Sequence, residues 1–370
     1  MTEPFSAIDR VRMARALHLA SRPLNGCDPN PRVGCVIDRG GEVVGEGWHK
    51  RAGEAHAEVA ALAAAAGNAR GATAYVTLEP CCHQGRTGPC SEALIAAGIA
   101  RVVFAVGDPD PKVDGGGAAA LSAAGIAVES GLLEQPAREI NRGFFHRHKH
   151  HRPFVTSKIA SSLDGRTALS DGTSKWITGD AARDDVQRLR ARSSAILTGI
   201  ETVLADDPSL TVRLTDKSGW QMPLRVIADS QLRTPATAKM LTLPGQTLVL
   251  TGCNDEVRTR HLAEAGAEVI RVATGSEGRI DLVAALKLLG DRGVNELMVE
   301  AGATLNGALY RQSLIDELVV YQAPVLLGTT ARSLLDIGAI NSMDQRAQLQ
   351  LQSLRRVGND WRLRLRPRNL

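Results

Sequence analysis

The stretch from His56 to Cys90 constrains this chain most, because it concentrates metal-binding residue types at short spacing. It contains His56-Ala57-Glu58, then Pro80-Cys81, and finally Cys90 directly after Pro89. A zinc ion that activates water takes three protein ligands and keeps a fourth position open. His56, Cys81 and Cys90 would provide one imidazole and two thiolates. A shared ion requires a fold that brings these segments together.

Glu58 and the order of these residues indicate the chemistry. Zinc-dependent nucleobase deaminases carry H-x-E, then Pro-Cys, then a second Cys, and the Glu serves as general acid and base. Glu58 lies two residues after His56, so along a helix the two side chains point in different directions. We therefore interpret Glu58 as the proton carrier and not as a fourth ligand. A structural zinc, or buried thiols without a metal, are the alternatives.

The second thiolate departs from the usual spacing. It is expected two residues after the first, where this chain has Gln84, so Cys82 and Cys90 are the candidates. Neighbouring cysteines in a loop tend to point apart, whereas Cys90 opens a predicted helix whose dipole favours a thiolate. We therefore predict Cys81 and Cys90 as the sulfur ligands.

Composition narrows the class of protein. Six cysteines occur in 370 residues, three of them between positions 81 and 90, which indicates metal binding in a reducing cytoplasm rather than disulfides. The formal net charge of +4 does not favour a nucleic-acid partner, although it suits a small anionic substrate. No apolar run reaches the roughly 18 residues of a membrane span. We expect a cytoplasmic protein without a nucleic-acid or membrane partner.

The length favours two domains. In the first, strands alternate with helices, which predicts a three-layer α/β domain. Helices are predicted over 7–20, 54–66, 89–97 and 118–124, and strands over 33–37, 42–47, 73–78, 101–106 and 126–129. Residues 141–153 are basic and contain His146, His148, His150 and His151, and we interpret them as an exposed linker. The predicted domains are residues 1–147 and 148–370.

The second domain is also predicted to be α/β. Strands are predicted over 153–160, 194–199, 225–229, 247–251, 268–272, 317–321 and 361–365, with a helix over 181–191, a loop through 205–208 and a solvated tail over 364–368. Residues 296–309 combine a strand, a Gly-containing turn and a helix start, where free N–H groups form an anion site. The G-x-G-x-x-G fingerprint of dinucleotide-binding domains is absent.

Two features of the first domain have alternative interpretations. Gly115-Gly116-Gly117 either holds an anion at a helix start or only opens the helix. Arg86 and Thr87 lie inside the cysteine loop, where a cation and a hydroxyl can hold a substrate phosphate, but a solvated loop arginine explains Arg86 equally well.

Several motifs, in order, resemble one family over nearly the whole chain. They are Pro29-Asn30-Pro31-x-Val33-Gly34, His56-Ala57-Glu58, TLEPCCHQGRTGPC (Thr77–Cys90), SLDGRTA (Ser162–Ala168), Trp176-Ile177-Thr178, TVLADDPSLTVR (Thr202–Arg213) and VEAGATLNGAL (Val299–Leu309). They are similar to the bifunctional riboflavin-biosynthesis deaminase/reductase. The resemblance implies a cytidine-deaminase-like domain that uses zinc, followed by a dihydrofolate-reductase-like α/β domain that uses NADPH. Family members have Ser at the position of Cys82.

The resemblance also implies substrates and site residues. The first domain is expected to deaminate 2,5-diamino-6-ribosylamino-4(3H)-pyrimidinone 5′-phosphate, and the second to reduce the ribosyl group, giving 5-amino-6-(5-phospho-D-ribitylamino)uracil. Asn30 and His49 are expected near the first substrate. The implied NADPH contacts are Ala160, Trp176, Thr202, Asp206, Ser230, Gly302, Ala303, Thr304, Leu305, Asn306, Gly307 and Ala308. The implied substrate contacts in the second domain are Ser174, Arg190, Leu210, Arg213 and Glu300. Lys158 and Glu300 are candidates for proton transfer, and a homo-oligomer is expected.

Two rival functions differ from this one in class. The first is a deaminase acting on nucleotides or tRNA and fused to a binding domain; a tRNA enzyme requires a basic stripe with stacking aromatic residues, and this chain, which is only 3% aromatic, has neither. A zinc-stabilised scaffold without catalysis would not depend on Glu58.

Overall fold

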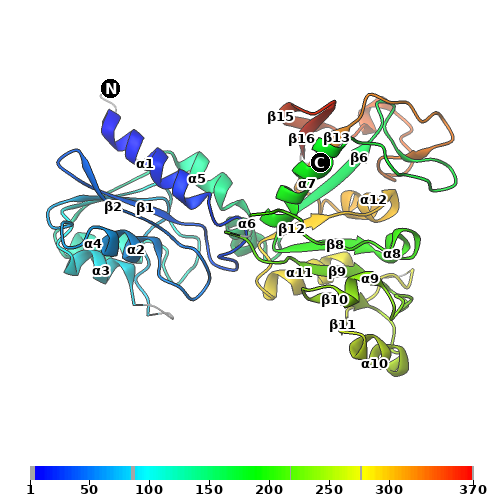
Figure 1. The fold of residues 1–370 in the computed structure, drawn as a ribbon, viewed down its shortest axis with the longest axis horizontal. Coiled ribbons are helices and arrows are strands. Elements are labelled where there is room, and N and C mark those ends of the chain that lie inside the picture. The colour runs from blue at the N-terminus through cyan, green and yellow to red at the C-terminus, as the bar shows by residue number, and fades with distance from the viewer. Residues whose placement is uncertain (1–4, 85–87, 217, 276, 369–370) are drawn as a thin grey trace. The chain divides into compact units, whose positions relative to one another are not determined.

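The computed structural model describes residues 5–84, 88–216, 218–275 and 277–368, which form two compact units (Figure 1). The first unit runs to His151 and includes a short return segment that ends at Gln221. The second unit begins at Arg152 and contains the rest. The predicted boundary between residues 147 and 148 lies close to this division, and those domain limits stay a prediction. Within the described ranges, no helix combines the length and apolar character needed to cross a membrane.

The first unit is a five-stranded sheet, in the order β2-β1-β3-β4-β5, with helices on both faces. Its elements are α1 (Ala7–Ala20), β1 (Gly34–Arg39), β2 (Glu42–Trp48), α2 (Ala57–Ala64), β3 (Thr73–Val76), α3 (Cys90–Ala96), β4 (Arg101–Phe104), α4 (Gly116–Ala123), β5 (Ala127–Ser130), α5 (Glu134–Ile140) and α6 (Arg142–His150). Strand β1 runs antiparallel to β2 and β3, whereas β3, β4 and β5 are parallel. The predicted three-layer α/β architecture is confirmed.

Alternating residues of the strands fill two cores, one on each face of this sheet. Ile37 and Val76 pack with helices α2, α3 and α4, while Val36 and Tyr75 pack with helices α1, α5 and α6. Because neighbouring strand residues point to opposite faces, this division follows directly from the period of two.

Glycines in β2 allow helix α2 to lie unusually close to the sheet. A Cβ atom at Gly47 would come within 2.4 Å of the Ala57 carbonyl oxygen, and one at Gly45 within 2.2 Å of the Ala61 carbonyl oxygen. Since neither contact is sterically allowed, only glycine fits at these two positions. The close packing fixes the first turn of α2, where His56 and Glu58 lie.

The second unit is a nine-stranded sheet in the order β11-β10-β9-β8-β12-β6-β13-β16-β15. Its elements are β6 (Phe154–Ser161), β7 (Arg166–Ala168), α7 (Asp180–Arg192), β8 (Ala195–Gly199), α8 (Ile200–Asp206), β9 (Leu224–Ala228), α9 (Lys239–Thr242), β10 (Thr247–Thr251), α10 (Glu256–Glu264), β11 (Ala267–Arg271), α11 (Leu282–Asp291), β12 (Glu296–Val299), α12 (Ala303–Arg311), β13 (Glu317–Gln322), β14 (Arg332–Ser333), a 3-10 turn (Met343–Gln345), β15 (Leu349–Val357) and β16 (Asp360–Pro367). From β11 to β13 neighbouring strands are parallel, and β16 and β15 add an antiparallel edge. The predicted α/β class of this domain is confirmed.

Two segments differ from their predicted structure. Residues 141–153 were expected to be an exposed linker, but most of them form helix α6, because Phe144 is buried in the core beside α1 and α5. The tail over 364–368 was expected to be solvated, but Arg364 lies in β16 and donates to the buried carboxylate of Glu317 at 2.6 Å. Both segments are rich in basic residues, which led to the prediction of solvent exposure, but Phe144 packs in the core and Arg364 forms an ion pair with Glu317.

Candidate active sites

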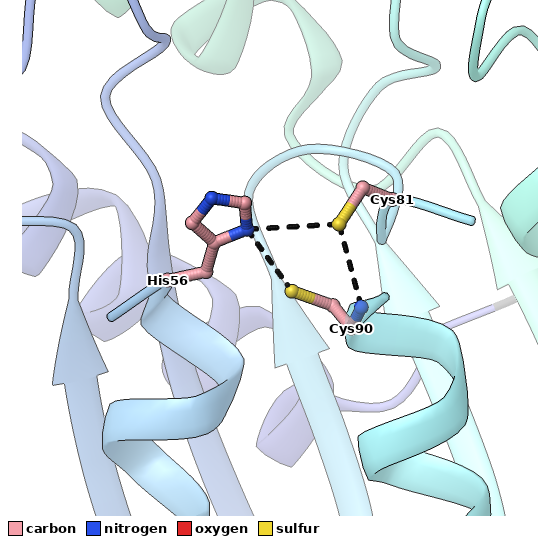
Figure 2. Close-up of side chains that lie close together, drawn as sticks. All are labelled: His56, Cys81 and Cys90. Atoms are coloured by element: carbon pink, nitrogen blue, oxygen red, sulfur yellow. Dashed lines mark hydrogen bonds between the residues drawn. The ribbon is translucent and has the colours of Figure 1, made fainter. Parts of the chain in front are cut away.

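Three predicted ligands converge in the first unit. His56 is the N-cap of α2, Cys90 is the first residue of α3, and Cys81 lies in the loop after β3. Their ligand atoms all lie within 4.8 Å of one another. Figure 2 shows His56 Nδ1 facing both sulfur atoms, 3.2 Å from Cys90 Sγ and 3.6 Å from Cys81 Sγ. One imidazole and two sulfurs are a donor set suited to zinc, and three protein ligands leave the fourth tetrahedral position of the ion to a water.

The hydrogen bonds of this cluster already favour a thiolate. The pKa of Cys81 is lowered to about 4, chiefly by a hydrogen bond from the Cys90 thiol, with further help from His56 against the effect of burial. The Cys90 backbone N–H also donates to Cys81 Sγ at 3.3 Å. Conversely, the hydrogen bond to Cys81 and burial raise the pKa of Cys90. Binding of a metal by both sulfurs would require Cys90 to lose its proton as well, because metal ligands are deprotonated.

Cys82 points away from this cluster. Its Sγ lies 3.7 Å from the carbonyl oxygen of Lys112 and 4.0 Å from that of Val113. It also fills the space beside Gly116, where a Cβ atom would come within 2.7 Å of Cys82 Sγ. In the structure the sulfur atom of Cys90, and not that of Cys82, therefore lies close to the sulfur atom of Cys81.

Glu58 is buried in the first turn of α2, with 3% of its surface exposed. Burial raises its pKa to about 7, although the nearby His56 and a hydrogen bond with Cys90 oppose the increase. A carboxyl group with this pKa can both accept and return a proton at neutral pH.

Asn30 and His49 lie in a row that leads to His56. His49 Nδ1 is 3.1 Å from the Ala55 carbonyl oxygen, so this nitrogen carries the proton and Nε2 is left as an acceptor. The amide nitrogen of Asn30, 3.2 Å away, is the matching donor. The His49 and His56 rings meet edge to face with their centroids 5.3 Å apart. Arg86, the other residue expected near this substrate, lies outside the described residues.

Glu79 supports the cysteine loop, and the sequence analysis missed it. Its carboxylate is 5% exposed and accepts hydrogen bonds from the backbone N–H groups of Gly115, at 3.2 Å, and Ala118, at 3.0 Å. The glycine run therefore does hold an anion, but the anion is the chain's own Glu79 carboxylate. The signal available in the sequence was an acidic residue directly before Pro80-Cys81.

The second unit contains a cavity of about 1440 Å³ at the carboxyl ends of its parallel strands. Ligands of open α/β sheets bind at this edge. Of the expected cofactor and substrate contacts, the cavity is lined by Ala160, Ser174, Trp176, Arg190, Thr202, Asp206, Leu210, Arg213, Ser230, Glu300, Gly302, Ala303, Thr304, Leu305 and Ala308. Lys158 also lines it.

Asn306 and Gly307 do not line this cavity, contrary to the expectation for the whole turn from 302 to 308. The Asn306 side chain accepts from Ser157 Oγ at 2.7 Å and donates to the Ala301 carbonyl oxygen at 2.7 Å. A Cβ atom at Gly307 would come within 2.0 Å of the Asp336 carbonyl oxygen. Both residues hold the start of α12 in place, because their contacts are with the chain itself.

Glu300, Arg190 and Lys158 form a charged cluster on the cavity wall. Arg190 donates to both Glu300 carboxylate oxygens, at 2.6 and 3.0 Å. Burial would raise the pKa of Glu300, but Arg190 and Lys158 outweigh it and hold that pKa below its ordinary value. Burial also lowers the pKa of Lys158, and Glu300 opposes this effect. Glu300 therefore remains ionised and has no proton to give, so Lys158 is the better candidate for the proton donor.

Comparison with known proteins assigns a family to each of the two domains. Residues 7–106 match the family model described as the cytidine and deoxycytidylate deaminase zinc-binding region, and residues 153–363 match the RibD C-terminal domain. The riboflavin biosynthesis protein RibD of Escherichia coli is 46% identical over 369 residues, covering 96% of this chain and 99% of that protein. That of Haemophilus influenzae is 45% identical over 377 residues and covers 99% of both.

Solved structures give the same result. Acinetobacter baumannii RibD is 43% identical, with a TM-score of 0.91, and covers 98% of this chain and 99% of its own. A Thermotoga maritima structure, described as a diaminohydroxyphosphoribosylaminopyrimidine deaminase/5-amino-6-(5-phosphoribosylamino)uracil reductase, is 30% identical, with a TM-score of 0.86, and covers 98% of this chain and 99% of its own.

The fold and the comparisons define a bifunctional enzyme in which a zinc-dependent deaminase domain precedes an NADPH-dependent reductase domain. The chain belongs to the family of the riboflavin biosynthesis protein RibD and acts in riboflavin biosynthesis. The resemblance inferred from the sequence motifs is thereby confirmed.

Proposed function

We propose that His56, Cys81 and Cys90 hold the zinc ion of the deaminase domain and that Glu58 carries its protons. The observation that supports this most is the convergence of the three ligand atoms within 4.8 Å beside a buried carboxyl group. The proposed substrate is 2,5-diamino-6-ribosylamino-4(3H)-pyrimidinone 5′-phosphate, in line with the activity named for the Thermotoga maritima structure. The second domain then reduces the ribosyl group of the deaminated product, which yields 5-amino-6-(5-phospho-D-ribitylamino)uracil.

Zinc supplies an activated water, because the ion lowers the pKa of a bound water to about 7. Glu58 accepts the proton that this water loses as it attacks the amino-bearing ring carbon. Glu58 would pass this proton to the ring nitrogen, then take the second proton from the added hydroxyl group and deliver it to the amino group, which leaves as ammonia. Asn30 and His49 orient the pyrimidine ring, since their amide and imidazole groups lie in one row with His56.

NADPH supplies the hydride for the second reaction. The N–H groups at the start of α12, around Gly302 and Ala303, are suited to the cofactor's phosphates. Arg213 binds the substrate phosphate through its charge. Lys158 delivers the proton that the ribosyl ring oxygen needs when the ring opens, because burial lowers its pKa.

The decisive experiment supplies each substrate separately to the purified protein. We expect ammonia release from the diamino substrate without NADPH, and NADPH oxidation only when the deaminated product is present. Absence of ammonia release would disprove the deaminase assignment, and equal oxidation of NADH would disprove the cofactor assignment.

We further propose that the enzyme works in the cytoplasm as a homo-oligomer, on the basis of its family. The six cysteines are free thiols in the structure, which suits a reducing compartment. Light scattering of the purified chain tests the proposal, because a monomeric mass would contradict it.

A further inference from the structure

The loop over 207–213 forms part of the cavity wall in an unusual backbone conformation. Asp207 and Leu210 are not glycines, yet their φ angles are +40° and +45°. Residues in this left-handed region persist only where the surrounding structure holds them. Leu210 is 3% exposed and packs in the core with Val186, which anchors one point of the loop. The remaining points depend on hydrogen bonds.

Two side chains of helix α7 provide those hydrogen bonds. Gln187 Oε1 accepts from the Arg213 backbone N–H at 3.0 Å, and Arg190 donates to the Thr211 carbonyl oxygen at 2.9 Å. Gln187 and Arg190 are three residues apart, so they lie on one face of the helix, and both line the cavity. Gln187 is only 6% exposed. Its carbonyl group therefore sets where the backbone of Arg213 lies.

Arg190 and Arg213 differ in whether their guanidinium groups are free to bind a substrate anion. The Arg190 guanidinium is occupied by Glu300 and by the Thr211 carbonyl. Arg213 is exposed on the cavity wall, and its guanidinium has no ion pair within the part of the chain that the structure describes. Arg213 acts on Glu300 only through the longer-range attraction of their charges and makes no hydrogen bond with it in the described residues, so its guanidinium N–H groups can still bind an anion.

We propose that Gln187 is a positioning residue of the reductase step: by accepting the Arg213 N–H it directs the Arg213 guanidinium toward the phosphate of the ribosyl substrate. The inference rests on the proposed function, in which Arg213 binds that phosphate. Gln187 does not touch the reacting atoms. Its role is to hold a strained loop so that a flexible cation is presented at one place, which strengthens binding without changing the chemistry.

Two substitutions of similar size separate this role from simple packing. Gln187→Met removes the acceptor and keeps the volume, whereas Gln187→Glu keeps an acceptor oxygen. NADPH oxidation is measured with 5-amino-6-(5-phosphoribosylamino)uracil, and an unchanged KM for NADPH shows that the second unit of each variant, which contains Gln187, is folded. For Gln187→Met we expect the KM for this substrate to rise about tenfold, with kcat within about twofold and the KM for NADPH unchanged. Gln187→Glu keeps the acceptor for the Arg213 N–H but adds a negative charge that repels the substrate phosphate, so its KM should lie between those of Gln187→Met and the unsubstituted chain. Arg188→Ala, an exposed neighbour on α7, should leave the KM unchanged.

Arg213→Ala distinguishes the inference from the function on which it rests. If Arg213→Ala raises the substrate KM and Gln187→Met does not, Gln187 has no positioning role although the phosphate assignment stands. If Arg213→Ala itself leaves the KM unchanged, the phosphate assignment is wrong and the inference fails with it. The double variant should be no worse than Arg213→Ala alone, since both act through one contact. Additive effects would overturn the proposal.

Discussion

Glu58 and His56 are two residues apart but have different backbone states. His56 is extended, with φ −69° and ψ 162°, whereas Glu58 already lies in the first turn of α2. The imidazole therefore faces the two sulfurs, while the carboxyl group is buried beside Cys90 with a pKa raised to about 7. The burial of Glu58 indicates a proton carrier, because a surface carboxylate would be ionised and could not donate at neutral pH.

Replacing Glu58 with Gln should abolish deamination and leave the metal site intact. The amide keeps the volume but can neither accept nor return the proton, so we expect ammonia release to fall by about 10²–10⁴-fold. Zinc content, measured by elemental analysis, should stay at one ion per chain. NADPH oxidation with the deaminated product serves as the control and should be unchanged. Retained deamination in a zinc-loaded variant would exclude Glu58 as the proton carrier.

A pair of matched cysteine variants tests the ligand set. Cys90→Ser should lose most of the zinc, because Cys90 Sγ lies 3.2 Å from His56 Nδ1 in the cluster. Cys82→Ser should keep it, since its sulfur faces the carbonyl groups of Lys112 and Val113. Elemental analysis of the zinc content of both purified variants shows which of the two cysteines is a ligand. Equal retention of zinc in the two variants would contradict the assignment.

Much of the proposed zinc site could be predicted from the sequence, because its residues lie in short local motifs or at the start of a helix. H-x-E and Pro-Cys are local patterns, and Cys90 was selected because it opens a helix. Contacts that depend on tertiary packing could not be predicted in this way. Glu79 reaches the start of α4, and Asn306 turns toward Ser157, only because the fold places those partners nearby.

At the level of elements, strongly patterned segments were predicted well. Helix α1 has the predicted bounds, and the parallel strands were recognised from their apolar runs. Helix α8 was not predicted, and its last two residues were assigned to a loop over 205–208, because Asp206-Asp207-Pro208 is a typical turn sequence. Strand β15 was missed because it is an exposed edge strand with alternating polar residues and no buried run.

Asp9, on helix α1, binds two residues of the sheet, and this contact should make stability depend on pH. Asp9 accepts from Tyr75 Oη at 2.7 Å and from Arg101 at 2.6 Å, and it closes the capping box with Ser6. Burial alone would raise the pKa of Asp9, but these hydrogen bonds outweigh it and hold the pKa below its ordinary value. Because the folded pKa lies below the unfolded one, the stabilisation is present above the unfolded pKa, about 3.9, and is lost as the pH falls through the folded value.

We therefore expect Asp9→Asn to lower the free energy of unfolding by about 2 kcal/mol at pH 7. The difference from the unsubstituted chain should shrink as the pH approaches 3. Urea unfolding followed by circular dichroism at pH 7, 5 and 3.5 measures it. Glu134→Gln, which breaks the exposed Glu134–Arg138 pair, is the control and should change the stability by less than about 0.5 kcal/mol. A difference that does not vary with pH would show that the charge of Asp9 is not what ties the helix.

At the scale of the whole molecule, each reaction has its site in a different unit. The proposed zinc ligands His56, Cys81 and Cys90 lie at the starts of α2 and α3 and in the loop after β3 of the first unit, whereas every residue that lines the large cavity belongs to the second. Within the described residues, His56, Cys81 and Cys90 are the one group of His, Cys, Asp or Glu side chains close enough to share a metal ion. The second reaction therefore has no structural reason to depend on zinc.

Removing zinc with a chelator should consequently separate the two activities. We expect ammonia release to fall with the zinc content, while NADPH oxidation persists when 5-amino-6-(5-phosphoribosylamino)uracil is supplied directly. With the diamino substrate instead, NADPH oxidation should stop, because the reductase then receives no deaminated product. Added zinc should restore the coupled reaction, which shows that the loss was not irreversible unfolding. A parallel loss of NADPH oxidation on the supplied product would mean that the metal site of the first unit also maintains the second.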